Sequence, residues 1–262
     1  MNVSERFACR VTGQHRGTQR HQPADQTPAD PDAALRQWLR EYAAKHPRWG
    51  HRRAYHDARA DGWPVNHKKL QRLWREAGLR VPQRRRRKRV GTSTVTTVTA
   101  NAPDNVWGID FQFDATTDGR PVKIVSIVDE HTREGLGGLV ERSITADILI
   151  DELDRIAATR GYPKVLRSDN GPEFACATMA DWAAARVGLS FIPPGQPWRN
   201  GYIESFNGRL RDECLNINEF WSIAHARVVI TDWKDEYNQH RPHSALGYLT
   251  PARYAAGCTH RN

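Results

Sequence analysis

Three acidic residues stand at positions where a purely structural carboxylate is unusual. Asp110 lies in the middle of an apolar stretch, and Asp169 opens the turn DNGPEF directly after another apolar segment. Glu204 lies early in YIESFNGRLRDECL, which has the spacing of a helix with an apolar face. Burial of a polar group without partners costs about 2–7 kcal/mol, and clustered anions also repel one another. A bound divalent cation would remove both costs.

Carboxylate ligands with open coordination positions suit Mg²⁺ or Mn²⁺. Two such ions about 3.5–4 Å apart can activate the attacking oxygen and stabilise the leaving oxygen at a phosphodiester. Each acid also has a structural interpretation. Asp110 could bond to the backbone, Asp169 could cap its turn, and Glu204 could be favoured by the helix dipole.

Other aspartates compete with Asp110 for the first of these positions, namely Asp114, Asp118 and Asp129. Asp114 lies on the same face of the predicted strand as Asp110, because side chains alternate along a strand. Periodicity therefore does not separate the two.

The segments that must position these acids predict a mixed sheet. The stretch VWGIDFQF alternates like a strand, and Asp118-Gly119 marks a hairpin turn. Further strands are expected at 121–129, 136–141, 165–168 and 189–192, and helices at 145–160, 177–187, 202–215 and 223–237. A meander followed by alternating helices and strands predicts an α/β fold with helices flanking a mixed sheet.

The N-terminal third predicts a separate helical module. Residues 1–32 form a polar basic arm, expected to be loose, and Asp32 is the expected N-cap of an amphipathic helix ended by Pro47. A second helix is predicted from Gly50 to Ala60, and a basic third helix begins near Asn66. Residues 33–82 are typical of a helix-turn-helix module, in which Lys68, Lys69 and Arg72 would contact DNA. A small bundle that only packs on the rest of the chain is the alternative.

Charge points to a polyanionic partner. The chain has 39 Lys and Arg against 30 Asp and Glu, a net charge of +9, and nucleic acid is the usual partner of such a balance. The predicted linker 83–100 begins with a run suited to neutralising phosphates, formed by Arg84, Arg85, Arg86, Arg87, Lys88 and Arg89. A nuclear-import signal has the same composition.

Several classes of protein are disfavoured. The four cysteines are far apart in the sequence, which leaves no zinc-ligand pair. The sequence has no apolar run of about 18 residues and no secretory signal, so we expect a soluble, intracellular protein without a membrane partner.

Several motifs resemble one family. WGIDF, VDEHTRE, RSDNGPEF, PPGQPWRNGYIESFNGRLRDECLN and YNQHRPHSALGYLTP are similar to the integrase-like core of bacterial insertion-sequence transposases of the DDE class. The closest resemblance is to the second-reading-frame (OrfB) protein of the insertion sequence three family, and it extends into HPRWGHRRAYHDARADGWPVNHKKLQRLWREAGLRVP. The resemblance covers nearly the whole chain.

The resemblance implies an RNase H-like core, here 101–258, that uses two Mg²⁺ or Mn²⁺ ions. It assigns the catalytic and metal-binding triad to Asp110, Asp169 and Glu204, the last two of which are 204 − 169 = 35 positions apart. The implied reaction is cleavage of the element ends, followed by transfer of their 3′-hydroxyls to target DNA.

Residues near the triad are expected to contact DNA or to support the site. Asn207 and Arg211 would contact DNA beside Glu204, Asp129 would pair with Arg133, and Asn170 with Glu173 would hold the loop around Asp169.

The resemblance also implies partners. We expect a multimer on DNA, an upstream-frame OrfA protein or fusion, and a place in the bacterial cytoplasm beside the nucleoid. Two competing hypotheses remain: a DNA-binding protein without turnover, and an RNase H-like nuclease that cuts without joining.

Overall fold

The computed structural model describes residues 3–20, 30–81, 99–192 and 200–259. Its larger part is built on one five-stranded sheet in the order β3-β2-β1-β4-β5. The strands are β1 (Val106–Ala115), β2 (Pro121–Asp129), β3 (Gly135–Glu141), β4 (Val165–Ser168) and β5 (Gly188–Phe191). The first three form an antiparallel meander, whereas β4 and β5 run parallel to β1.

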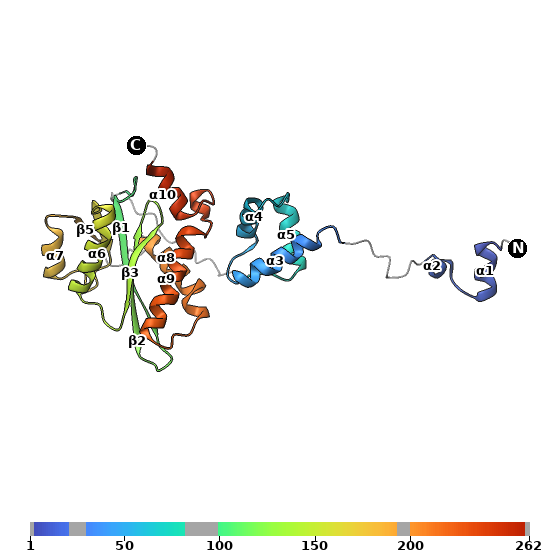
Figure 1. The fold of residues 1–262 in the computed structure, drawn as a ribbon, viewed down its shortest axis with the longest axis horizontal. Helices are drawn as coiled ribbons and strands as arrows, with labels where there is room; N and C mark the ends of the chain where they lie inside the picture. Colours follow the sequence, from blue (N-terminus) through green and yellow to red (C-terminus); the bar gives the residue numbers. More distant parts are fainter. Residues whose placement is uncertain (1–2, 21–29, 82–98, 193–199, 260–262) are drawn as a thin grey trace.

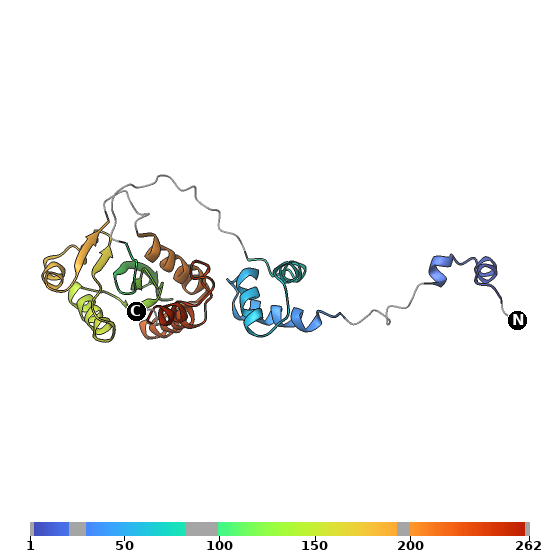
Figure 2. The same ribbon diagram turned by 90° about the horizontal axis from the view of Figure 1, so that it is seen from above.

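Helices cover both faces of this sheet (Figures 1 and 2). On one face, α6 (Ala146–Arg160) and α7 (Ala177–Ala183) bury an apolar core that includes Trp107, Ile109 and Ile127. On the other, α8 (Gly201–Glu213) and α9 (Ile223–Gln239) pack on Ile124 and Val128. The short helices η3 (Leu215–Ile217) and η4 (Ser244–Leu246) and the final helix α10 (Pro251–Thr259) complete this part. The RNase H-like mixed sheet expected from the sequence is confirmed.

The helical module is a second unit with an apolar core of its own. It consists of α3 (Ala33–Lys45), α4 (His51–Ala60) and α5 (His67–Glu76). Leu39, Leu70 and Leu73 are fully buried at its centre. Asn66 caps α5 by accepting the backbone N–H of Lys69 over 2.8 Å, the usual role of asparagine at this position.

One expectation for the N-terminal third was wrong, and another is confirmed in position only. The arm is not loose throughout, because residues 3–20 contain α1 (Glu5–Thr12) and α2 (Arg16–Gln19). Ser4 caps α1, and Glu5 pairs with Arg16 and Arg20, which joins the two helices. Asp32 stands at the N-cap position of α3, as expected, but its side chain makes no capping bond, because its carboxylate lies 2.5 Å from the ammonium of Lys69.

In the described part of the chain, none of the helices combines the length and the apolar character that a membrane span requires.

Candidate active site

Asp110 projects from the middle of β1 toward α8. Its neighbours Trp107 and Ile109 belong to the core beneath α6, whereas Gly108 faces the other side. A Cβ atom on Gly108 would lie 3.4 Å from the Cβ of Ile203, so α8 packs closely on this face. Asp110, two residues further along the strand, therefore points to the same helix.

The register of the parallel strands places Asp169 beside Asp110. Gly108 pairs with Arg167, and two more residues along each strand lead to Asp110 and Asp169. Asp169 directly follows the end of β4 and is exposed. Its Oδ1 accepts the backbone N–H of Gly171 over 3.0 Å, which fixes the turn.

The loop that carries Asp169 is held from two sides. The amide of Asn170 donates to the carbonyl oxygen of Ile192 over 2.8 Å, and Glu173 forms an ion pair with Lys123 of β2. The expected roles of Asn170 and Glu173 are thus confirmed by contacts on both flanks of the turn.

Glu204 enters the site from the first turn of α8. Ile203, Phe206 and Leu210 bury the opposite face of this helix, so Glu204 is left at the surface. The protein around its carboxyl still raises the pKa of Glu204 by partial desolvation.

The other two acids act electrostatically on Asp110. Burial, together with the charges of Asp169 and Glu204, raises the pKa of Asp110 to about 6, against hydrogen bonds that lower it. Asp114 is placed differently, near the end of α8, where burial and the Asp114 charge raise the pKa of Cys214 to about 12. Of the two aspartates on this strand face, Asp110 is therefore the one subject to both other acids.

This set of groups fits a divalent cation. Oxygen donors from three acids, one of them desolvated, are the ligands that Mg²⁺ and Mn²⁺ prefer. Within residues 3–20, 30–81, 99–192 and 200–259, however, no three His, Cys, Asp or Glu side chains are gathered closely enough to hold a metal ion. A cation at Asp110 would offset the charges of Asp169 and Glu204 that act on it.

Comparison with known proteins identifies the family. Two models of the integrase core domain match residues 100–197 and 185–251, and a model of an HTH-like domain matches residues 30–87. The sequence is 44% identical over 257 residues to an uncharacterized 31.7 kDa protein of insertion element IS407 from Burkholderia multivorans, covering 98% of this chain and 92% of that protein. It is 24% identical over 230 residues to the transposase InsF for insertion sequence IS3A of Escherichia coli K12, covering 82% of this chain and 80% of InsF.

The chain belongs to the insertion sequence three family of DDE transposases. It is therefore an integrase-type polynucleotidyl transferase of DNA transposition. Among solved structures, it is similar to the HTLV-2 integrase catalytic core domain in complex with magnesium. That match has a TM-score of 0.47 and 15% identity, and covers 59% of this chain and 98% of that chain.

In this transposase, Asn207 positions Asp110. Its Nδ2 donates to Asp110 Oδ2 over 3.0 Å, and its Oδ1 accepts from the amide of Gln112 over 2.8 Å. Both amides are buried, so Asn207, which we expected to contact DNA, is directed into the protein. Arg211 also bonds internally, donating to the carbonyl oxygen of Phe113 over 2.8 Å. Gln112 was missed, although its place two residues after Asp110 puts it on the same strand face.

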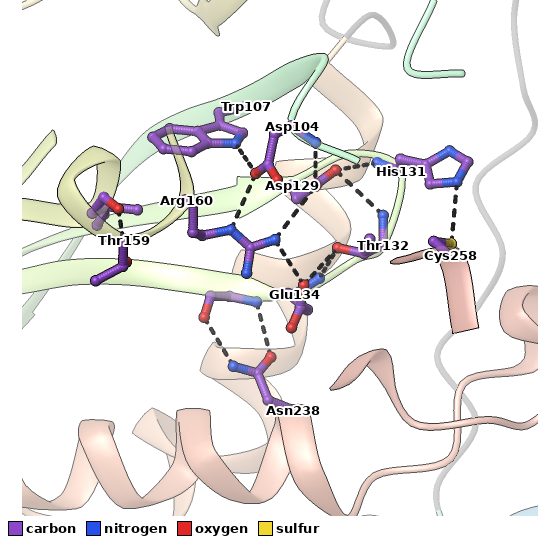
Figure 3. Close-up of polar contacts among 12 residues, drawn as sticks. Asp104, Trp107, Asp129, His131, Thr132, Glu134, Thr159, Arg160, Asn238 and Cys258 are labelled. Atoms are coloured by element: carbon purple, nitrogen blue, oxygen red, sulfur yellow. Dashed lines mark hydrogen bonds and ion pairs between the residues drawn. The ribbon is translucent and has the colours of Figure 1, made fainter. Parts of the chain in front are cut away.

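The expected pairing of Asp129 with Arg133 was wrong. Asp129 is fully buried and accepts three backbone N–H groups, from Asp104, His131 and Thr132 (Figure 3). Arg160 bonds Asp104 and Glu134 in the same network, each over 3.1 Å. Arg133 instead lies over the ring of Tyr202, 3.6 Å from its centroid. Asp129 thus shapes the turn after β2.

The basic residues of α5 differ in their exposure and in their ion pairs. Lys68 is exposed on α5, whereas Lys69 is paired with Asp32. Arg72 is exposed but lies 3.7 Å from Glu76 and 3.8 Å from Asp32. The basic run Arg84–Arg89 lies outside the described residues.

Proposed function

We propose that this transposase cleaves the ends of its own element and transfers the freed 3′-hydroxyls to target DNA, with Asp110, Asp169 and Glu204 as the catalytic and metal-binding residues. One observation carries the assignment. Three acids come from β1, from the turn after β4 and from the first turn of α8, and burial together with the charges of Asp169 and Glu204 raises the pKa of Asp110 to about 6. A structural carboxylate is not normally left partly buried beside two like charges without a counter-charge.

The three residues would hold one or two Mg²⁺ or Mn²⁺ ions. When bound, these ions would supply Lewis-acid activation of the attacking oxygen and neutralise charge on the leaving oxygen of the phosphodiester.

The chain's own residues supply orientation. Asp110 is fixed on a central strand by the amide of Asn207, and Asp169 is fixed in a turn by the N–H of Gly171. Glu204 is exposed on a helix whose opposite face is packed, so it can adjust its rotamer toward a cation held by the two aspartates. Two rigid acids and one adjustable acid suit a site that accepts water first and a 3′-hydroxyl second.

We assign DNA binding outside the active site to residues 33–82 and to the linker that follows, with Lys68 and Arg72 as surface contacts of α5 and the run Arg84–Arg89 on the backbone phosphates. Neutralised phosphates release counterions, which makes such binding strongly dependent on salt. Because both ends of an element must be joined, we infer a multimer on DNA. An OrfA protein or fusion would add specificity for the ends, and the nucleoid in the cytoplasm would be the site of action.

The test is strand transfer with purified protein and labelled DNA that carries the element's own end. Joined product should require Mg²⁺ or Mn²⁺ and disappear with EDTA. The variants Asp110→Asn, Asp169→Asn and Glu204→Gln should each bind DNA without joining it.

Two matched controls are available. Asp114→Asn changes an acid on the same strand face, and Asp212→Asn changes an acid later in α8. Both should join DNA normally. Joining by Glu204→Gln at the wild-type rate would refute the site, and cleavage without joining would instead identify a nuclease.

A further inference from the structure

The helical module contacts the catalytic core through α4. The guanidinium of Arg53 donates from Nε to the carbonyl oxygen of Pro242 over 3.3 Å. Its Nη1 lies 3.9 Å from Oε1 of Glu213. Pro242 belongs to the RPHSALGY segment, residues 241–248, which follows α9. Figure 1 shows the module on the side of the core where the C-terminal helices lie.

Glu213 is shared by two arginines. Arg241 holds its carboxylate through two bonds, of 2.7 Å and 2.6 Å, and both side chains are buried. Arg53 is the second cation on the same carboxylate and comes from the other unit. Burial and the neighbouring Arg241 lower the pKa of Arg53 to about 10, so it keeps its charge at neutral pH.

Ring contacts extend the interface along α4. His56, almost one turn after Arg53, stacks on Tyr248 with ring centroids 3.7 Å apart and planes at 16°. Tyr248 has a φ of 65°, a backbone conformation that residues other than glycine rarely adopt. Its backbone N–H donates a hydrogen bond to the carbonyl oxygen of His243. At the other end, Nδ1 of His46 lies 3.8 Å from Oε1 of Glu236 on α9.

These contacts end on the helix that carries a proposed catalytic acid. Glu213 is the last residue of α8 and Glu204 lies in its first turn. Glu213 lies nine positions after Glu204, which corresponds to about 14 Å of helix at 1.5 Å per residue. Glu213 is therefore one of the points at which α8 is held, at the end opposite to Glu204.

We infer that the RPHSALGY segment and Glu213 form a docking surface for the helical module of the same chain, and that Arg53 links the placement of that module to α8. A module docked in this way would present α5 to DNA at a fixed orientation relative to Glu204. The docking stands on its own contacts, whereas its consequence for Glu204 rests on the proposed function.

The docking is tested by cross-linking in the full-length protein without DNA or metal. A short bismaleimide should join His56→Cys to Tyr248→Cys within one chain, identified by a linked peptide in monomer-sized protein. The pair Arg59→Cys with Tyr248→Cys is the matched control, because Arg59 lies on the same helix but is exposed. The single-cysteine variants control for reaction at the native thiols.

The contribution of Arg53 to the docking is tested by adding Arg53→Met to the cross-linking pair. We expect the rate of cross-linking to fall about tenfold, the effect of losing a contact of ordinary coupling strength. Arg52→Met, a change at the preceding exposed arginine, should leave the rate unchanged. Cross-linking no faster than in the Arg59 control, cross-linking only between chains, or equal rates for the two arginine variants would overturn the inference.

A separate arm distinguishes docking from catalysis. Glu204→Gln, added to the His56→Cys and Tyr248→Cys pair, should cross-link at the same rate as the pair alone, since Glu204 is not part of the interface. Loss of strand transfer with normal cross-linking affects only the assignment of the active site. Normal strand transfer without cross-linking overturns only the docking.

Discussion

Asn207 donates a hydrogen bond of 3.0 Å to Oδ2 of Asp110, and through it α8 is fastened to the central strand of the sheet. The bond stabilises the ionised form of Asp110 and so lowers a pKa that burial and two nearby acids raise. Glu204 and Asn207 lie on neighbouring turns of one helix, which couples the orientation of one acid to that of another.

Removal of this bond should move the pH dependence of the reaction. In Asn207→Ala the pKa of Asp110 should rise above its present value of about 6, because a contact that lowers it is gone. The acidic limb of the profile of strand-transfer rate against pH should therefore shift to higher pH. Asn216→Ala, at an exposed position beyond α8, should leave the profile unchanged. A uniform loss of rate without a shift would contradict this role.

The metal-free protein should become more stable when Asp110 is neutralised. The folded pKa of about 6 lies above the ordinary value of 3.8, so the ionised group destabilises the fold above pH 6. At 1.36 kcal/mol per pKa unit, Asp110→Asn should gain about 3 kcal/mol at most.

Denaturant unfolding in EDTA at two pH values measures this gain. It should be present at pH 7.5 and should vanish as the pH falls through 6 toward 4, where Asp110 of the wild-type protein is protonated. Asp114→Asn should show no comparable gain, and an equal gain at both pH values would rule out the titration of Asp110 as its cause.

Divalent cations should stabilise the wild-type protein by binding to the folded state. The midpoint of thermal unfolding should rise with Mg²⁺ or Mn²⁺ concentration, as it does for any ligand of the native state. Asp110→Asn and Asp169→Asn should abolish most of the rise, whereas Asp114→Asn should preserve it. A rise that survives both substitutions would place the cation elsewhere.

The buried pair of Glu213 and Arg241 should be costly to break. Removal of one partner leaves a buried charge uncompensated, which typically costs about 3–5 kcal/mol. Glu213→Gln should lower the free energy of unfolding by an amount of this order, measured in urea. The exposed pair of Asp118 and Arg120 is the control, and Asp118→Asn should have no measurable effect.

DNA affinity should depend on the exposed cations of α5. Replacing Lys68 and Arg72 by Ala should weaken binding and lower the slope of log affinity against log salt by about 0.9 for each lost phosphate contact. Titrations at several salt concentrations measure the slope. Arg40→Ala, on the exposed side of α3, is the control. An unchanged slope would remove α5 from the interface with DNA.

Local patterns in the sequence predicted most of the fold. Alternation along β1 and the turn at Asp118-Gly119 gave the hairpin, and apolar spacing gave α3, α6, α8 and α9 within a few residues. These features depend on neighbours in the chain, which is why a single sequence contains them.

The unpredicted features depend on contacts between distant segments. The spacing of residues along α8 did not predict the hydrogen bond from Asn207 to Asp110, which lies 97 residues earlier. Arg53 meets Pro242 across 189 residues, and Asp129 accepts from the backbone of Asp104 in place of pairing with Arg133. Asp32 had the residue type of a cap, but the charge of Lys69 attracted its carboxylate. The triad could be named from motifs, whereas its supporting bonds required the fold.

The parallel pairing of β1 with β4 also determines when the site is assembled. Asp110 and Asp169 are 169 − 110 = 59 residues apart, whereas the hairpin of β1 and β2 closes over a short turn. Because long loops close slowly, the meander should form early with Asp110 as a solitary charge. Asp169 and Glu204 come close to Asp110 only when β4 and α8 join the sheet. The electrostatic cost of the site therefore raises the free energy of the later steps of folding and does not slow formation of the first hairpin.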